Sequence, residues 1–146
     1  MNEIENESQW MVAEDQPKYS NDFLSNPDLL YKLIGICMEV HRELGRGLSE
    51  VLYKDAIEQE FKWKGITYER EKKFTVDYKG ITLPHYYFAD FVVGNEIILE
   101  LKAQQNVIEN HYGQVINYLA ISKCPLGLLV NFAERSLQYK RIILTP

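Results

Sequence analysis

The segment of residues 88–102 constrains the fold most, because it places an acid, a turn and a second acid within sequence typical of β-strands. Asp90 precedes the turn at Gly94, and Glu100 follows that turn two residues before Lys102. Side chains alternate between the faces of a strand, so Glu100 and Lys102 share one face while the neighbouring leucines are buried on the other. Two carboxylates on one face could hold Mg²⁺ or Mn²⁺, and a lysine beside the metal could orient a water or stabilise phosphoryl charge. The segment therefore indicates metal-dependent cleavage of a phosphodiester.

The register between the two strands decides whether the acids meet. A two-residue loop would pair Asp90 with Leu99 and send its side chain to the face opposite that of Glu100. A three-residue loop, a bulge or an equivalent offset of one residue would place Asp90 beside Glu100. We therefore expect such an offset if the pair binds a metal. The alternative is an ordinary exposed ion pair, because an acid two residues before a lysine also arises on the solvent face of hairpins.

The chain of 146 residues, 46% of them hydrophobic, is long enough for one globular domain with its own core. Its formal net charge of −5 is unlike that of most nucleic-acid binders, which carry a basic patch. Residues 1–28 contain seven acids and one lysine, however, so the remainder carries a net charge of +1. We expect residues 1–25 to form an acidic tail that is disordered or loosely attached, and residues 26–146 to form the domain.

Hydrophobic spacing and the positions of glycine and proline divide the domain into helices and strands. The first helix is expected to begin at Asn26-Pro27-Asp28 and to end at Gly45, and the second to run over Ser49–Lys64. Three strands, a helix and two more strands follow, at about Tyr68–Tyr78, Ile81–Val93, Ile97–Ala103, Asn106–Ser122, Leu126–Phe132 and Gln138–Leu144. The fourth strand is a continuous apolar run, which is typical of a central strand covered on both faces.

Two sets of polar residues lie on the expected second and third helices. Glu50 and Tyr53 share one face of the second helix, within the motif Gly47-Leu48-Ser49-Glu50-Val51-Leu52-Tyr53. One side of the third helix carries His111, Gln114 and Tyr118. Both sets have a structural alternative. An acid in a first turn complements the helix dipole, and glutamine and tyrosine on a helix are often surface or packing residues.

These elements follow the order helix-Glu, strand-Asp, strand-Glu-x-Lys, helix-Gln-x-x-x-Tyr, and in this the chain resembles the PD-(D/E)XK nuclease superfamily. The closer resemblance is to the GxxExxY proteins, a bacterial branch named after the motif that reads here from Gly47 to Tyr53. The match runs from about Leu29 to the C-terminus and includes Val40–Gly45, Asp90, Glu100–Lys102, His111, Gln114, Asn117–Leu119 and Leu128–Phe132. Two positions depart from the pattern, since Ala89 replaces the proline before the first acid and Ala133 replaces a glycine.

The resemblance implies a mixed α/β fold with an αβββαβ core, in which helices flank a central mixed sheet, here with an extra first helix and a terminal strand. It also implies the site. Asp90 and Glu100 would bind Mg²⁺ or Mn²⁺ directly, the backbone carbonyl of Leu101 would complete the protein ligands, and Glu50 would bind through water. The catalytic residues would be Glu50, Asp90, Glu100, Lys102 and Gln114. The substrate would contact Tyr118, His111, Lys72 and Lys73.

The function that follows is hydrolysis of nucleic acid by a metal-dependent nuclease, with DNA favoured over RNA. No stretch is long and apolar enough to span a membrane, so we expect a cytoplasmic protein without a membrane partner. Cys37 and Cys124 lack metal-ligand spacing and are expected to be reduced and buried. A homodimer or a partner protein stays open. The alternative function is a catalytically inactive nuclease-fold module that binds nucleic acid or a protein.

Overall fold

The computed structural model of the chain describes residues 3–6, 11–12, 24–105 and 109–145. Its helices are α1 (Leu29–Leu44), α2 (Glu50–Lys64) and α3 (Glu109–Ser122). Its strands are β1 (Glu3–Asn6), β2 (Met11–Val12), β3 (Tyr68–Tyr78), β4 (Ile81–Val93), β5 (Ile97–Lys102), β6 (Leu126–Asn131) and β7 (Gln138–Thr145). The expected order of elements in the domain is confirmed.

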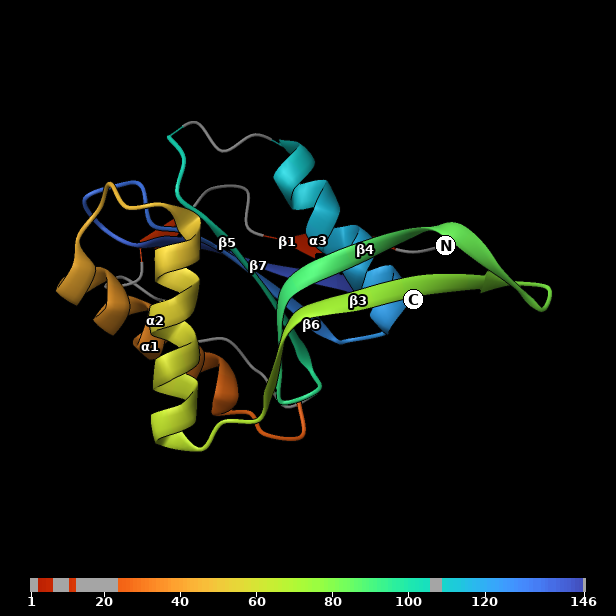
Figure 1. Cartoon of the computed structure of the whole chain (residues 1–146), viewed down its shortest axis with the longest axis horizontal. Coiled ribbons are helices and arrows are strands. Elements are labelled where there is room, and N and C mark those ends of the chain that lie inside the picture. The colour runs from red at the N-terminus through yellow and green to blue at the C-terminus, as the bar shows by residue number, and fades with distance from the viewer. Residues whose placement is uncertain (1–2, 7–10, 13–23, 106–108, 146) are drawn as a thin grey trace.

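The strands form one mixed sheet in the order β1-β7-β6-β5-β4-β3, with β2 also pairing with β7. The β5 and β6 strands are parallel, while β3 with β4, β4 with β5, and β6 with β7 are antiparallel. Parallel neighbours need a crossover connection, and α3 supplies it between β5 and β6 (Figure 1). This arrangement confirms the mixed sheet that the sequence predicts.

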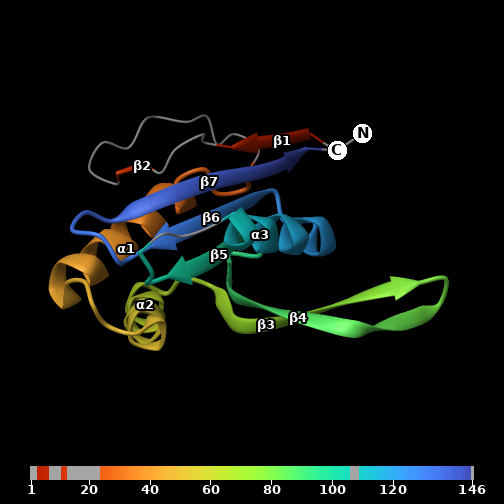
Figure 2. The same ribbon diagram turned by 90° about the horizontal axis from the view of Figure 1, so that it is seen from above.

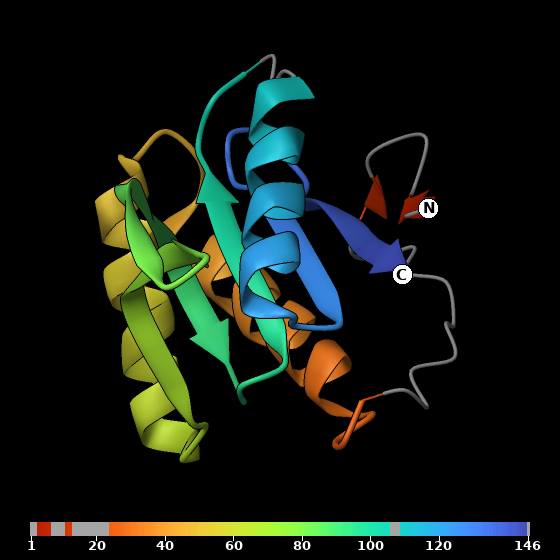
Figure 3. The same cartoon turned by 90° about the vertical axis from the view of Figure 1, so that its right-hand side faces the viewer.

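The helices cover the two faces of the sheet. Side chains of α1 and α2 pack against one face in a core that includes Leu33, Ile57 and Leu99. On the other face, α3 contributes Val115 and Leu119 to a smaller core. Figure 3 shows α3 crossing the strands in front of the sheet, with α1 behind it (Figure 3). Since β6 is buried along its whole length, it is the central strand that its apolar sequence indicates.

The start of the first helix differs slightly from the sequence prediction. The first helix begins at Leu29, because Pro27 and Asp28 lie in a turn in which the Leu29 amide donates to the carbonyl of Asn26 at 3.0 Å. Leu24 is already buried in the core. Two short strands from the acidic segment, β1 and β2, pair antiparallel with β7. Residues 1–2, 7–10 and 13–23 of the tail lie outside the described residues, and the domain boundary at residue 26 stays a prediction.

A long hairpin extends from one edge of the sheet. The β3 and β4 strands pair from Tyr68 and Val93 to Tyr78 and Ile81, whereas β4 pairs with β5 over only three residues. The far part of the hairpin therefore projects beyond the other strands, as Figure 2 shows (Figure 2). In the part of the chain that is described, no helix is long and apolar enough to cross a membrane.

Candidate active site

The hairpin between β4 and β5 has the register that the metal hypothesis requires. Its ladder pairs Phe91 with Leu99 and Val93 with Ile97, which leaves a three-residue loop. Gly94 in this loop adopts a φ of 59°, and a Cβ added there would lie 2.6 Å from Leu29. The offset continues along the strands, so Asp90 reaches the position beside Glu100 rather than beside Leu99.

The two acids lie where β4 and β5 separate. The backbone amide of Asp90 donates to Oε1 of Glu100 at 2.7 Å, and the amide of Leu101 donates to Oδ2 of Asp90 at 2.8 Å. These amides bond to side-chain carboxylates instead of to the carbonyls of the opposite strand. The exposed fractions of Asp90 and Glu100 are only 7% and 3%. The sheet therefore fixes both carboxyl groups through its own backbone at a buried fork.

A lysine that the sequence analysis did not assign to the site completes this group. The ammonium of Lys54, on α2, lies 2.7 Å from Oδ1 of Asp90 and 3.2 Å from Oε1 of Glu71. Glu71 adopts a φ of 52°, which is uncommon for a residue with a side chain. The only sequence signal for Lys54 is its position four residues after Glu50, on the same face of the helix.

Burial and the charge of Asp90 shift the pKa of Glu100. Burial and then the negative charge of Asp90 raise the pKa of Glu100 to about 9, against the smaller opposing effects of the Asp90 amide and of Lys102. Burial alone would lower the pKa of Lys54, but its hydrogen bonds and ion pairs with Asp90 and Glu71 outweigh this effect and raise it. The site therefore places a carboxyl group with a raised pKa, that of Glu100, beside the ion pair between Asp90 and Lys54.

Tyr118 of α3 closes the other side of the fork. Burial first, and then the negative charges of Glu100 and Asp90, raise the pKa of its phenol to about 12. Its ring also lies 6.3 Å from that of Tyr87 and 6.4 Å from that of Phe74, both on the projecting hairpin. Tyr118 thus connects α3, the two acids and the base of the hairpin, and it stays neutral at physiological pH.

The structure brings Glu50, Lys102 and His111 near one another. Burial and the positive charge of Lys102 lower the pKa of His111, while the negative charge of Glu50 acts in the opposite direction. Nδ1 of His111 is buried without a hydrogen-bond partner in the described structure. Gln114 is exposed, three residues after His111 on the same side of α3. Glu50 and His111 therefore lie near Lys102 on the α2 and α3 sides, and a position of Gln114 at the fork stays a prediction.

The two predicted substrate lysines, Lys72 and Lys73, lie farther out on β3. The ammonium of Lys72 is 2.8 Å from Glu69, and that of Lys73 lies 4.5 Å from the centre of the Tyr86 ring. Arg70, from the same basic run, pairs with two acids of α2. Part of this run therefore stabilises the hairpin against α2, and a role for Lys72 and Lys73 in substrate binding stays a prediction.

Tyr53, the last residue of the GxxExxY motif, has a structural role. Its hydroxyl donates to the carbonyl of Gly45 at 2.7 Å and accepts from the amide of Leu48 at 3.2 Å. The ring is buried and stacks on Phe132 at 4.5 Å. The tyrosine therefore fixes the loop that leads into α2, and with it the position of Glu50.

The donor set at the fork fits Mg²⁺ or Mn²⁺. These ions prefer oxygen ligands, and Mg²⁺ commonly binds through one or two carboxylates, several waters and substrate phosphates. Within the described ranges, no group of three or more histidine, cysteine, aspartate or glutamate side chains is arranged for a metal. Asp90 and Glu100 would thus be the side-chain ligands, and the other ligands would be backbone oxygen and water.

The raised pKa of Glu100 predicts how stability depends on pH when no metal is bound. The folded protein keeps this proton up to about pH 9, whereas the unfolded chain releases it near the ordinary value of 4.5. The unfolded state thus binds fewer protons in this range, so the contribution of Glu100 to stability is complete below pH 4.5 and falls as pH rises toward 9. Glu100→Gln keeps a neutral group in place. In EDTA, the melting temperature of the variant should rise relative to that of the wild type as pH increases. A difference in melting temperature that stays constant with pH would contradict the raised pKa of Glu100.

A family model described as the PD-(D/E)XK nuclease superfamily matches residues 27–142. A solved structure described as "Crystal structure of SSO0001" is similar to the chain, with a TM-score of 0.50 and 20% sequence identity. The similarity covers 65% of this chain and 49% of that chain, about half its length, and concerns the fold alone. No curated protein matches the sequence. Because the family model spans most of the sequence and its fold is the one described above, the chain belongs to the PD-(D/E)XK nuclease superfamily.

Proposed function

We propose that the protein is a metal-dependent nuclease that hydrolyses phosphodiester bonds of nucleic acid, with DNA as the favoured substrate. The observation that carries the proposal is the placement of Asp90 beside Glu100, with lysines on both sides of the pair. A structural hairpin has no need for two buried acids that repel each other. A divalent cation would offset that repulsion and would remove the desolvation cost of ionising Glu100.

Each residue has a defined part in this reaction. Asp90, Glu100 and the carbonyl of Leu101 would hold Mg²⁺ or Mn²⁺, and Glu50 would bind a water of that ion. When bound, the metal would supply a polarised water and would neutralise phosphate charge. Lys102 orients the attacking water or stabilises charge on the phosphoryl group.

Three helix residues and two lysines would position the substrate. Gln114 orients the substrate phosphate, and Tyr118 packs behind it. His111 contacts the substrate from the exposed side of α3, while Lys72 and Lys73 contact the strand along the hairpin. These roles follow from the superfamily pattern, and the charge interactions of Tyr118 with both acids and of His111 with Lys102 support two of them.

The ammonium of Lys54 lies 2.7 Å from Oδ1 of Asp90, where it would compete with a bound cation, and this predicts the effect of Lys54→Met. The substitution removes a positive charge from Oδ1 of Asp90, so affinity for Mg²⁺ should rise in calorimetric titration. It also leaves Asp90 buried without its ion pair, which should lower the free energy of unfolding in EDTA by about 1–3 kcal/mol. Lys73→Met, at an exposed position, is the control for both measurements. Unchanged Mg²⁺ affinity in the Lys54 variant would contradict competition between the lysine and the metal.

The motif from Gly47 to Tyr53 supports membership of the GxxExxY branch, and a cytoplasmic location fits the absence of a spanning helix in the described structure. A homodimer or a partner protein would direct the nuclease to its target. The second candidate is a binding module without catalysis, which the internal ion pair of Asp90 with Lys54 favours, because that pair stabilises the fork without a metal.

The experiment that separates the two candidates is cleavage of labelled DNA and RNA, single and double stranded, in Mg²⁺, Mn²⁺ or EDTA. A nuclease should cleave at least one of them only when a divalent ion is present. Binding without cleavage, in every metal and on every substrate, would favour the binding module.

A further inference from the structure

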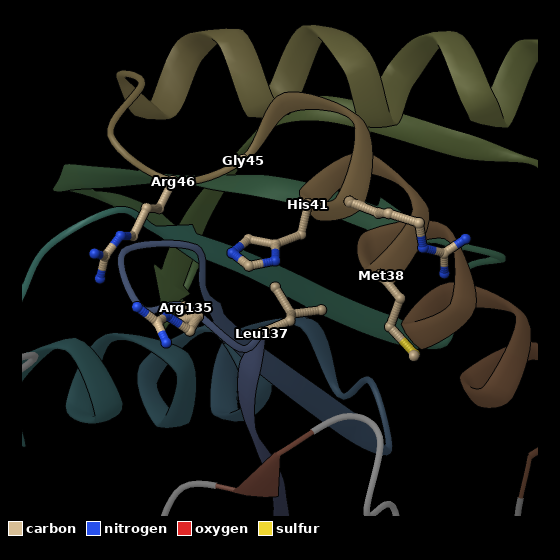
Figure 4. Close-up of a pocket in the computed structure, with 7 residues that line it drawn as sticks. Met38, His41, Gly45, Arg46, Arg135 and Leu137 are labelled. Atoms are coloured by element: carbon tan, nitrogen blue, oxygen red, sulfur yellow. The ribbon is translucent and has the colours of Figure 1, made fainter.

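A pocket of about 410 Å³ lies beside the loop that leads into α2. Its walls come from the end of α1, from the α1–α2 loop and from the β6–β7 loop. The lining residues are Met38, His41, Arg42, Gly45, Arg46, Arg135 and Leu137. Figure 4 shows the side chains of Arg46 and Arg135 on the same side of the pocket, with the His41 ring between them and Met38 (Figure 4). Three of the seven lining residues are arginines and none is an acid.

The charge in this pocket is incompletely balanced by the protein. Arg42 is paired with Glu39 at 2.8 Å. For Arg46 and Arg135, the described part of the chain contains no ion pair. Two guanidinium groups on one side of a cavity repel each other, and an anion between them would turn that repulsion into attraction.

The loop that carries Arg46 is held rigidly. Gly45 and Gly47, on either side of the arginine, adopt φ values of 69° and 101°, which favour glycine. The Tyr53 hydroxyl bonds to both ends of this turn, at Gly45 and at Leu48. The backbone of Arg46 is therefore held in place while its side chain stays exposed, and binding would cost little ordering of the loop.

The loop that carries Arg135 is attached to the same framework. His41 Nε2 lies 2.9 Å from the carbonyl oxygen of Glu134, and Oδ1 of Asn131 accepts from the amide of Ala133 at 3.1 Å. The ring of Phe132 lies against the rings of both Tyr53 and His41. These contacts make His41 a hydrogen-bonded packing residue, and they join the two arginine loops into one preformed wall.

The pocket is connected to the strand of the candidate active site through hydrogen-bonded backbone. The amide of Phe132, whose ring lies against Tyr53 and His41, donates to the carbonyl of Lys102 at 2.8 Å. Arg46 comes four residues before Glu50, in the loop that leads into α2.

We propose that this pocket binds a terminal phosphate group of the nucleic-acid strand, through Arg46 and Arg135. The inference rests on the proposed function, because it takes nucleic acid as the substrate. Guanidinium groups match phosphate oxygens with paired hydrogen bonds, and a phosphate monoester carries close to two negative charges at pH 7. A monoester at a strand end can enter a concave site, whereas an internal phosphodiester must follow the surface. The pocket would make the enzyme select substrates by their ends.

The test is binding of labelled single-stranded oligonucleotides in EDTA, where the metal-dependent reaction is stopped. The oligonucleotides share one sequence and carry a 5′-phosphate, a 3′-phosphate or hydroxyls at both ends, all at one salt concentration because salt weakens every phosphate contact. One phosphorylated end should bind at least about tenfold more tightly than the hydroxyl form, the scale of a charge-assisted contact. Arg46→Gln and Arg135→Gln should each reduce that preference, and the double variant should abolish it.

Lys62→Gln is the matched control, since it removes the same charge near the far end of α2 and should keep the preference. Equal binding of all three oligonucleotides by the wild type would overturn the inference, as would a preference that survives in the double variant. A uniform loss of affinity for every oligonucleotide in the arginine variants would also overturn it, because it would indicate contacts with internal phosphates.

Cleavage by the wild type without any preference for a phosphorylated end would contradict the proposed phosphate pocket but would support the proposed nuclease function. A preference for a phosphorylated end without cleavage of any nucleic acid would contradict the proposed nuclease function. It would support the pocket as a site that binds strand ends.

Discussion

Lys102→Ala should lower the rate of nucleic-acid cleavage by a factor of about a hundred or more, the scale seen when a group that stabilises transition-state charge is removed. The positive charge of Lys102 is felt both at Glu100 and at His111, so the ammonium lies near the acids and near α3. Removing it deletes a positive charge beside the metal, so the affinity for Mg²⁺ should persist or rise. Single-turnover cleavage and calorimetric titration on the same preparation measure the two effects separately.

Lys79→Ala is the control for this variant, because Lys79 lies in the turn at the tip of the projecting hairpin, between β3 and β4. It should change neither cleavage nor metal affinity by more than a small factor. A Lys102 variant that cleaves at close to the wild-type rate would mean that the ammonium has no part in the reaction. Loss of metal binding in this variant would instead assign Lys102 to the structure of the fork.

Asp90→Asn and Glu100→Gln should each weaken binding of Mg²⁺ or Mn²⁺ by more than about a hundredfold. Loss of an outer-shell partner of a metal ligand already costs about 10–100-fold, and these changes remove a charged oxygen that touches the ion. Cleavage should fall with metal binding. Both replacements are close in shape to the original side chains, so the hydrogen bonds to the Asp90 and Leu101 amides can be kept.

Glu71→Gln gives the matched control, since it removes a neighbouring carboxylate that pairs with Lys54 and is not a proposed ligand. Its metal affinity should stay near that of the wild type. Thermal unfolding of each variant in EDTA establishes that it is folded. Undiminished metal binding in both the Asp90 and the Glu100 variants would rule out the proposed ligands.

Much of this architecture could be predicted from the sequence because the signals are local. The alternation around Glu100 and the turns at Gly80 and Gly94 define the three-stranded unit, and Gly65 ends α2 in the left-handed conformation. From the sequence, a metal site could be seen to require an offset that brings Asp90 beside Glu100. The three-residue loop that provides it became visible only in the structure, since residues 94–96 are compatible with more than one turn.

The parts that the sequence could not predict depend on contacts between distant segments. Lys54 reaches Asp90 from α2 because the helix packs across the strands, and no local pattern encodes that meeting. Arg46 and Arg135 line one pocket although 89 residues separate them in the chain. The sequence predicts a start of α1 that is too early. The capping residues Asn26, Pro27 and Asp28 form a turn that precedes the helix, and the first helical turn begins at Leu29.

The most direct test of the proposed metal site is cleavage of the DNA and RNA panel by the wild type and by Glu100→Gln, with Mg²⁺ or Mn²⁺ and with EDTA. Cleavage by the wild type should require the metal, and the glutamine variant should lose it, because the amide cannot supply the negative charge of a carboxylate ligand. Cleavage by the variant at the wild-type rate, or cleavage by the wild type that continues in EDTA, would contradict the claim that Asp90 and Glu100 hold a catalytic metal.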